Sequence, residues 1–287
     1  MIRSSLLIFS LADAILIRYK GVVSVEPTRP TDIPEAQFVL ASASPRRRDL
    51  LAFLGPRYEV IASDAEERDD PVPSAVLTAL PPFGLPRATH PSLLAWRKAS
   101  HVAELAPGAV VLGADTIVVL GDVVLNKPRD PAHALQMLAS LSGRVHTVYT
   151  GLCVIRKDEG GKMKDEAAND VLSVHPSSFI LHPYQIWLDL VSSEVEIAPL
   201  SAGEIAAYVA TGEPLDKAGA YGIQGLGGQL VRSVRGSYTA VVGLPLTNTH
   251  RLLRAAGVDN LRDPEQSYRR WLAQQGKEPL PWPPTLP

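Results

Sequence analysis

Residues 39–51 have the sequence Val39-Leu40-Ala41-Ser42-Ala43-Ser44-Pro45-Arg46-Arg47-Arg48-Asp49-Leu50-Leu51. This order, an apolar run followed by small residues and a polar segment, predicts a short strand, a tight turn and then a helix. Ser44 is a favourable N-cap, and Pro45 suits the first helical position, where its missing N–H leaves no helical hydrogen bond unmade. We expect the rest of the fold to be arranged around this strand–turn–helix unit.

Three consecutive arginines occupy the first turn of the expected helix. The helix dipole already places partial positive charge at that end, so the arginines are unfavourable there unless an anion lies close to them. Unpaired backbone N–H groups, a serine hydroxyl and guanidinium groups together form a typical phosphate site. The alternative is an ordinary solvated basic turn, and this stretch alone does not decide between the two.

Composition limits the fold and the function. The chain has 287 residues, of which 46% are hydrophobic, and a formal net charge of −2. A sizeable core is possible, while the small net charge offers no general attraction to nucleic acid or to an anionic membrane. The only cysteine, Cys153, lies in an apolar run and is expected to fill the core. Because one cysteine favours a reducing compartment and no apolar run is long enough to span a membrane, we expect a cytoplasmic protein.

Carboxylates occur in two settings that could carry chemistry. Residues 63–70 form an acidic run that includes Glu67, and such a run is either a solvated loop or a source of oxygen ligands for a divalent cation. Residues 110–120 are expected to form a strand that is apolar except at Asp115 and Thr116. A carboxylate in that setting is costly to bury unless it is paired or metal-bound. The alternative is a structural aspartate that caps a turn.

The remaining pattern predicts alternating helices and strands. Helices are expected at residues 45–54, 93–105, 131–141, 201–211 and, as the last, 245–256. Strands are expected at residues 58–62, 110–120, 123–125, 145–155 and 195–198. Gly121-Asp122 predicts a hairpin turn, and Ser201 with Glu204 predicts a capping box. Residues 230–234 and 238–242 are expected to form a second hairpin.

Four segments are expected to lie outside this regular core. Residues 1–36 are interpreted as an N-terminal extension, and residues 261–287 as a proline-rich tail with little order. Residues 71–92 are interpreted as a loop or insertion because they carry many prolines and little periodicity. Residues 171–193 are interpreted as a second insertion, which is either a true addition or a gene-model artefact.

Two motifs suggest a ligand site but fit no familiar pattern. The two His-Pro pairs, which begin at residues 175 and 182, do not have a zinc-site spacing, so an inserted segment is the simpler interpretation. Residues 212–228 are rich in glycine, but the glycines do not follow a strand and open a helix, as a dinucleotide site requires. They instead predict a loop whose backbone approaches a ligand closely.

Four separated motifs together resemble the Maf family of nucleoside triphosphate pyrophosphatases. They are, in chain order, Leu40-Ala41-Ser42-Ala43-Ser44-Pro45-Arg46-Arg47, Gly113-Ala114-Asp115-Thr116, Lys127-Pro128 and Asp216-Lys217-Ala218-Gly219-Ala220-Tyr221-Gly222-Ile223-Gln224-Gly225. The resemblance covers about residues 38–257, and residues 71–92 and 171–193 depart from the family pattern. It implies an α/β fold with an elongated mixed sheet, flanking helices and a cleft between two lobes, similar to inosine triphosphate pyrophosphatase.

The resemblance also implies a substrate branch. The branch that acts on dTTP and UTP carries arginine directly after Ser-Pro, threonine after Gly-Ala-Asp, and an Ile-Gln-Gly triplet. Arg46, Thr116 and Gln224 occupy these positions, so the chain is similar to that branch rather than to the branch that acts on 7-methyl-GTP. By the same resemblance, Asp115 is the proton acceptor, and a homodimer is expected.

The motif residues suggest how the α–β phosphoanhydride of a nucleoside triphosphate would be hydrolysed to a monophosphate and pyrophosphate. The substrate-binding residues are expected to be Ser42, Ser44, Arg46, Arg47, Thr116, Asp216, Lys217 and Gln224. The catalytic residues are expected to be Asp115, Lys98 and Lys127. Glu67 and Asp115 are expected to bind Mg²⁺ or Mn²⁺, which would polarise a phosphoryl oxygen and lower the pKa of a bound water. Thr116 and Gln224 would contact a pyrimidine edge, and Asp216 and Lys217 would form an ion pair on the far wall.

Two alternatives stay open. The chain could be a non-catalytic nucleotide-binding regulator of cell division, although no charged motif position is substituted. It could also be a pyrophosphatase directed at 7-methyl-GTP or at purine nucleotides. Neither nucleic acid nor a membrane is expected as a partner in any of these interpretations.

Overall fold

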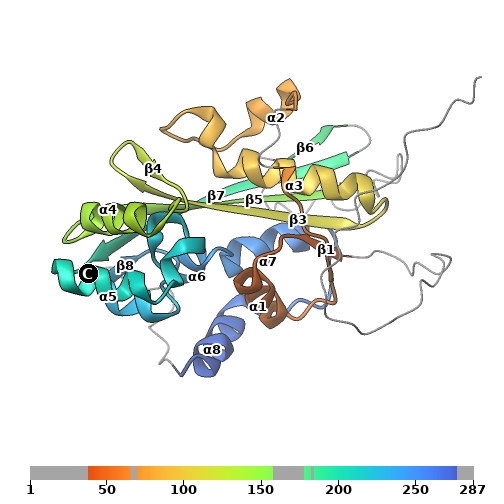
Figure 1. Cartoon of the computed structure of the whole chain (residues 1–287). Coiled ribbons are helices and arrows are strands. Elements are labelled where there is room, and N and C mark those ends of the chain that lie inside the picture. The colour runs from red at the N-terminus through yellow and green to blue at the C-terminus, as the bar shows by residue number, and fades with distance from the viewer. Residues whose placement is uncertain (1–37, 66–69, 158–177, 182–183, 277–287) are drawn as a thin grey trace, which may run out of the picture. The chain divides into compact units, whose positions relative to one another are not determined.

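A mixed sheet forms the centre of the computed structural model (Figure 1), which describes residues 38–65, 70–157, 178–181 and 184–276. The strands in these ranges are β1 (Phe38–Ala41), β2 (Glu59–Val60), β3 (Val110–Leu120), β4 (Val123–Leu125), β5 (Val145–Lys157), β6 (Ser178–Leu181), β7 (Tyr184–Ile197) and β8 (Val231–Arg235). Their order in the sheet is β2-β1-β3-β5-β7-β6, with β4 paired to β3 and β8 paired to β7.

The sheet changes direction at β3. Strands β2 and β3 both pair parallel to β1, whereas β5 pairs antiparallel to β3 and β7 antiparallel to β5. The β5–β7 pairing runs without interruption from Val145 opposite Glu196 to Lys157 opposite Tyr184. Because β5 pairs with β3 and β7 over most of its length, three long strands form a rigid base for the segments that carry polar residues.

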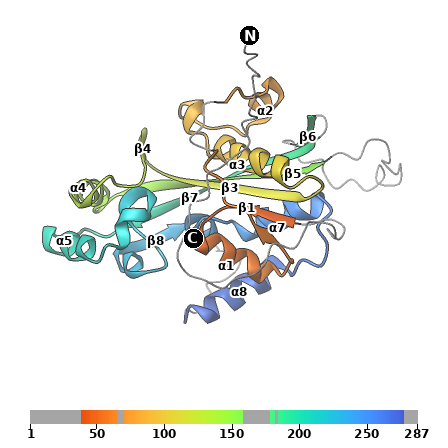
Figure 2. The same ribbon diagram turned by 45° about the vertical axis from the view of Figure 1, so that its right-hand side comes forward.

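Helices cover both faces of the sheet. They are α1 (Pro45–Leu54), α2 (Ser74–Ala79), α3 (Pro91–Leu105), α4 (Pro131–Leu141), α5 (Ala202–Ala210), α6 (Tyr238–Val242), α7 (Leu246–Ala255) and α8 (Pro264–Gln274). The connections contain the 3₁₀ turns η2 (Arg87–Thr89), η4 (Glu213–Asp216), η5 (Ala218–Ala220) and η6 (Leu226–Leu230). Figures 1 and 2 show α3 on one face of the sheet and α1, α7 and α8 on the other. None of the described helices is long and apolar enough to cross a membrane.

Helix α3 packs with its backbone directly against the sheet because two strand glycines leave room for it. A Cβ atom on Gly113 would lie 2.2 Å from the carbonyl oxygen of Ala95, and one on Gly151 would lie 2.1 Å from the amide nitrogen of Ser92. Cys153 is fully buried in the apolar cluster on this face, and burial raises the pKa of its thiol. The expectation that this cysteine fills the core is therefore confirmed.

The larger apolar cluster lies on the opposite face. It joins alternate residues of β1 and β3 to the buried sides of α1, α4, α5, α7 and α8. Alternation along β1 sends Leu40 to this cluster and Val39 to the cluster beneath α3, as expected for a strand that is buried on both faces.

Several local expectations are confirmed. The strand–turn–helix unit forms β1 and α1, the β3–β4 hairpin turns at Gly121-Asp122, and α4 has the expected bounds. The capping box also forms: the Ser201 hydroxyl accepts from the Glu204 amide, and the Glu204 carboxylate accepts from the Ser201 amide. The α/β class with a mixed sheet and flanking helices is likewise as expected.

Other expectations are wrong. Residues 71–92 are not a loop, because they contain α2, η2 and the start of α3; that they are an insertion stays a prediction. Residues 184–193 belong to β7 and are therefore part of the sheet, while the insertion expected at 171–193 stays a prediction. Residues 238–242 form α6 and not a strand, since the Ser237 hydroxyl caps the Ala240 amide and starts a helical turn. The strand expected at 58–62 is shorter, with only Glu59–Val60 in the sheet.

The C-terminal region also differs from expectation. Helix α7 is not the last helix, because α8 follows it within the segment expected to lack order. Asp263 caps α8 through the Gln266 amide, and Pro264 occupies the first turn. Trp271 of α8 is fully buried, so this helix belongs to the core. Residues 1–36, both His-Pro pairs and the proline-rich end of the tail lie outside the described residues.

Candidate active site

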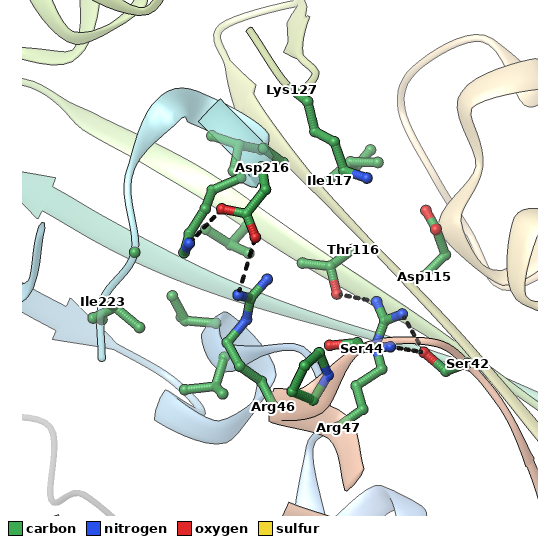
Figure 3. Close-up of a pocket in the computed structure, with 18 of the residues that line it drawn as sticks. Ser42, Ser44, Arg46, Arg47, Asp115, Thr116, Ile117, Lys127, Asp216 and Ile223 are labelled. Atoms are coloured by element: carbon green, nitrogen blue, oxygen red, sulfur yellow. Dashed lines mark hydrogen bonds and ion pairs between the residues drawn. The ribbon is translucent and has the colours of Figure 1, made fainter. Parts of the chain in front are cut away.

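A cavity of about 610 Å³ lies where α1 begins and where β3 passes beneath α3. Its walls come from segments that are far apart in the sequence: residues 42–47, 115–118, 126–127, 216–218 and 221–224, with Lys98 from α3. Figure 3 shows labelled residues from these segments around a common space. Every candidate residue named from the sequence lines this cavity except Glu67, which lies outside the described residues.

Arg47 is the most firmly held cation of the cavity. Its Nε donates to the Gly243 carbonyl oxygen at 2.9 Å, and its two terminal nitrogens donate to Ser42 Oγ at 3.2 Å and Thr116 Oγ1 at 3.1 Å. The Ser44 amide also donates to Ser42 Oγ, at 3.3 Å. Arg47 therefore joins the β1–α1 turn to β3 and to the end of α6, and braces the cavity while adding positive charge to it.

Two details of the β1–α1 turn differ from the sequence-based expectation. Ser44 occupies the N-cap position of α1, but its side chain makes no capping hydrogen bond. Instead, its amide binds the Ser42 hydroxyl, so Ser42 organises the turn. Ser44 lines the cavity. Because its hydroxyl does not cap the helix, the hydroxyl is available to bind a ligand.

Thr116 is held by a relay of hydroxyl groups. Thr150 Oγ1 donates to the Ala240 carbonyl oxygen at 2.7 Å and lies 2.9 Å from Thr116 Oγ1. Because each hydroxyl has one proton, Thr116 must donate to Thr150 while it accepts from Arg47. The Thr116 hydroxyl can therefore only accept a hydrogen bond from a ligand. If Thr116 contacts a pyrimidine edge, as expected from the sequence, its hydroxyl must face a donor of the base.

Lys98 and Asp115 form a close ion pair in the cavity. Lys98 Nζ lies 2.8 Å from Asp115 Oδ1, and the side chains are only 8% and 14% exposed. The carboxylate in the middle of β3 is therefore paired, which resolves the cost of burying it there. Asp115 Oδ2 makes no hydrogen bond or ion pair with another residue of the described ranges. Lys98 thus contacts the carboxylate directly, in addition to facing the cavity.

The opposite wall carries a chain of alternating charges. Lys217 Nζ lies 2.6 Å from Asp216 Oδ1, which confirms the expected ion pair, and Arg46 Nη1 lies 3.9 Å from Asp216 Oδ2. Partial burial disfavours the charged form of Asp216, but the hydrogen bond from Lys217 and the charges of Lys217 and Arg46 together outweigh it, and the pKa of this carboxyl is lowered. Asp216 therefore stays ionised and holds two cations at the mouth of the cavity.

Lys127 differs from the other cations because it is exposed and pairs with no residue in the part of the chain that the structure describes. It follows β4 and lines the cavity between β3 and η4. Figure 3 shows its side chain on the same side of β3 as Asp115. An unpaired ammonium group in this position can bind an anion without first breaking an ion pair.

The glycine-rich loop is held by a carboxylate that the sequence did not suggest. Glu213 accepts from the amides of Leu226 and Gly227 at 2.9 and 3.0 Å, and from the Tyr208 hydroxyl at 2.9 Å. Partial burial opposes ionisation of Glu213, but the hydrogen bonds from the Gly227 and Leu226 amides and from Tyr208, with the charge of Lys217, together outweigh it, and its pKa is lowered. A glutamate in a glycine-rich stretch was the available signal, but the residues that it binds are distant in sequence.

The inner end of the cavity is lined by Tyr221 and Gln224. The Tyr221 hydroxyl lies 2.8 Å from Nε2 of His146, a buried histidine on β5 that sequence reasoning missed. Gln224 Oε1 is buried and has no hydrogen-bond partner among the described residues. An acceptor without a partner at a cavity wall is a polar group that a ligand can satisfy.

The fold and this cavity define an α/β protein in which five cationic side chains, those of Arg46, Arg47, Lys98, Lys127 and Lys217, line one cavity with the paired carboxylate of Asp115. A family model described as "Maf-like protein" matches residues 37–256, and it begins where the expected N-terminal extension ends. That match covers more than half of the chain, and the chain belongs to the Maf family.

Individual relatives agree with the family match. A protein of Moorella thermoacetica named "dTTP/UTP pyrophosphatase" is 44% identical over 224 residues, which cover 78% of this chain and 97% of that protein. A protein of Shigella boydii with the same name is 45% identical over 216 residues, which cover 75% of this chain and 90% of that protein. A third protein with this name, from Anaeromyxobacter dehalogenans, is 44% identical over 221 residues, which cover 77% of this chain and 94% of that protein.

Proposed function

We propose that this protein hydrolyses dTTP and UTP to the nucleoside monophosphate and pyrophosphate. The observation that carries the proposal is that Arg46, Asp115 and Lys127, from three separate segments, line one cavity. The names of the relatives, each 44–45% identical to this chain, support the choice of substrates.

Charge neutralisation is the first requirement for cleavage of a phosphoanhydride. Arg46 and Lys127 come from opposite sides of the cavity, and both are partly or fully exposed, so they can bind the phosphates of a triphosphate. The first turn of α1 adds unpaired backbone N–H groups at the same end. Arg47 contributes charge from a fixed position, because its guanidinium group is held by Gly243, Ser42 and Thr116.

Asp115 is suited to accept a proton from the attacking water. Its Oδ1 is fixed by Lys98, which sets the orientation of the carboxylate, and its Oδ2 carries the remaining acceptor capacity. Water attacks the α-phosphorus, its proton passes to Oδ2, and the bond to the bridging oxygen breaks as pyrophosphate leaves. The in-line geometry requires the leaving group to point away from Asp115, toward the cations at the cavity mouth.

We also propose a divalent cation, Mg²⁺ or Mn²⁺, as cofactor. The described residues contain no group of three or more metal-ligating side chains, so they do not form a complete metal site by themselves. Mg²⁺, however, is commonly held by one or two carboxylates together with substrate phosphates, and Asp115 supplies one such carboxylate, with Glu67 proposed as the second. The cation would polarise a phosphoryl oxygen when it is bound.

The test is a substrate panel with the full chain in the presence of Mg²⁺. The panel contains dTTP, UTP, CTP, 7-methyl-GTP and ITP, and phosphate is detected with malachite green with and without inorganic pyrophosphatase. We expect phosphate from dTTP and UTP only when pyrophosphatase is added, because the product is pyrophosphate. Nucleotide binding without any phosphate release would indicate the non-catalytic alternative, and faster turnover of 7-methyl-GTP or ITP would indicate the purine-directed one.

A further inference from the structure

Glu213 lies outside the cavity, yet it holds one of the cavity walls in place. One of its carboxylate oxygens accepts from the Gly227 amide and the Tyr208 hydroxyl, and the other accepts from the Leu226 amide. The Tyr208 hydroxyl accepts in turn from the Gly222 amide at 3.0 Å. Both ends of the segment 222–227 are therefore tied to a single carboxylate.

The glycines of this segment are needed because the chain wraps closely around Glu213. A Cβ atom on Gly225 would lie 2.4 Å from Oε2 of Glu213, and one on Gly222 would lie 2.9 Å from Oε1. A side chain at either position would therefore clash with the carboxylate, and only glycine lets the loop pass this close to it. The loop conformation is thus set jointly by the hydrogen bonds and by the steric fit.

Between the two anchored ends lie Ile223 and Gln224, which line the cavity. The carboxamide oxygen of Gln224 is buried and without a partner among the described residues. A carboxamide presents one acceptor beside one donor, which complements the N3–H donor and the adjacent carbonyl acceptor of uracil or thymine. Correct placement of this pair depends on the backbone of the segment 222–227.

We propose that Glu213 is a positioning residue for nucleobase recognition, which acts by fixing the loop that presents Gln224 to a uracil or thymine ring. The proposal rests on the function proposed above and deepens it. The triphosphate contacts come from Arg46, Lys127 and the start of α1, none of which is bound by the Glu213 carboxylate. Loss of this carboxylate should therefore weaken binding of the base and leave binding of the polyphosphate unchanged.

The principal test is Glu213→Gln, which keeps the shape but turns an N–H donor toward the Leu226 or the Gly227 amide. We expect the KM for UTP to rise about tenfold to a hundredfold, as for the loss of a hydrogen bond to a charged acceptor, with kcat changed less than about threefold. The inhibition constant of inorganic tripolyphosphate should stay within about twofold of the wild-type value.

Glu204→Gln is the matched control. Glu204 also accepts from a backbone amide, that of Ser201, but it lies at the exposed start of α5. We expect its KM for UTP to be unchanged. Tyr208→Phe removes the hydroxyl between Glu213 and Gly222, and it should raise the KM in the same direction. The double variant Glu213→Gln/Tyr208→Phe should lose less than the product of the two single effects, because both act on one loop.

Binding of UMP, measured by calorimetry, separates this proposal from the proposed function. If the wild type binds UMP but does not hydrolyse UTP, the hydrolase proposal fails, and the effect of Glu213→Gln on UMP affinity still decides the positioning role. Equal weakening of UMP and tripolyphosphate would show general damage to the cavity and overturn the proposal. An unchanged UMP affinity in Glu213→Gln would overturn it as well.

Discussion

His146 is a buried titratable residue whose side chain supports the cavity wall. Its Nε2 lies 2.8 Å from the Tyr221 hydroxyl, and the two rings meet edge to face with centroids 5.4 Å apart. Nδ1 has no hydrogen-bond partner among the described residues. Burial lowers the pKa of His146 to about 4, so the imidazole is neutral at pH 7.

This histidine makes stability depend on pH. Its pKa is lower in the folded chain than in the unfolded chain, so the unfolded state binds more protons as the pH falls below about 6.5. Between about pH 7 and pH 4, we expect His146 alone to remove about 3 kcal/mol from the free energy of unfolding. Urea titrations of the wild type and of His146→Gln across this range measure it. The stability advantage of the wild type should shrink on acidification, and a constant difference would contradict the expectation.

Asp115 and Lys127 allow a direct test of the cavity chemistry. Removal of a group that stabilises a phosphoryl-transfer transition state commonly costs about a hundredfold to a thousandfold in kcat. We therefore expect Asp115→Asn and Lys127→Ala each to lose at least that much UTP turnover with Mg²⁺ present. Asp122→Asn, in the exposed β3–β4 turn, is the matched carboxylate control and should retain activity. Pyrophosphate release at the wild-type rate by either cavity variant would refute the assigned roles.

At the scale of single elements, the close packing of α3 on the sheet is the most sensitive contact. A methyl group on Gly151 would meet the backbone of Ser92 and Pro91 at 2.1–2.6 Å, so the helix must move away. We expect Gly151→Ala to cost at least about 1–3 kcal/mol of stability and to lower activity as well, because Lys98 moves with the helix. Thermal unfolding and UTP turnover measure the two effects.

Gly203→Ala provides the comparison for that variant. Gly203 lies in α5, and the nearest atom to an added Cβ would be Ser201 Oγ at 3.9 Å. Alanine is favoured over glycine in a helix by about 0.5–1 kcal/mol. We therefore expect this substitution to stabilise the protein slightly. Equal destabilisation by both glycine substitutions would show that the helix–sheet contact is not the cause.

Elements with local signals could be predicted from the sequence, and those fixed by distant contacts could not. The Ser44-Pro45 helix start, the Gly121 turn and the Ser201 capping box depend on neighbouring residues. Residues 238–242 are β-branched or aromatic in part, but the Ser237 cap and packing of Tyr238 on Trp271 favour a helix. Here tertiary contacts outweigh strand propensity.

The sequence could predict which residues line the cavity, but not the hydrogen bonds that hold them in place. The sequence indicated eleven of its lining residues, of which ten lie in the four motifs and the eleventh is Lys98, because separated motifs imply a shared site. The sequence could not indicate that Arg47 reaches Gly243, or that Glu213 binds residues 226 and 227. These hydrogen-bond partners are brought together by the tertiary fold of the loops, which a local sequence pattern does not predict.

At the scale of the whole molecule, α8 packs against α1 and Tyr238, which in turn contact segments that line the cavity. Its Ser267 hydroxyl donates to the Phe53 carbonyl of α1 at 2.8 Å. Its Trp271 ring lies 5.8 Å from that of Tyr238. The Tyr238 hydroxyl in turn donates to the Ile223 carbonyl of the glycine-rich loop at 3.1 Å. A helix beyond the family match at 37–256 therefore contacts the end of α1 and, through Tyr238, is linked to the glycine-rich loop.

Trp271→Ala tests this support. Truncation of a fully buried tryptophan typically costs about 3–5 kcal/mol, and we expect a loss of that size in chemical denaturation. UTP turnover should also fall at temperatures where the variant is still folded, because the packing of α8 against α1 and Tyr238 is weakened. Arg270→Ala changes an exposed neighbour in the same helix and should leave both quantities unchanged. Full stability in Trp271→Ala would place α8 outside the cooperative unit.

The reactivity of Cys153 can be used to measure unfolding of the protein. It is the only cysteine, it has no exposed surface, and burial raises its thiol pKa. Alkylating reagents need a solvent-accessible thiolate, so they can label this residue only when β5 separates from α3. The labelling rate with a maleimide should therefore track global unfolding, rise steeply with urea, and increase in parallel in Gly151→Ala.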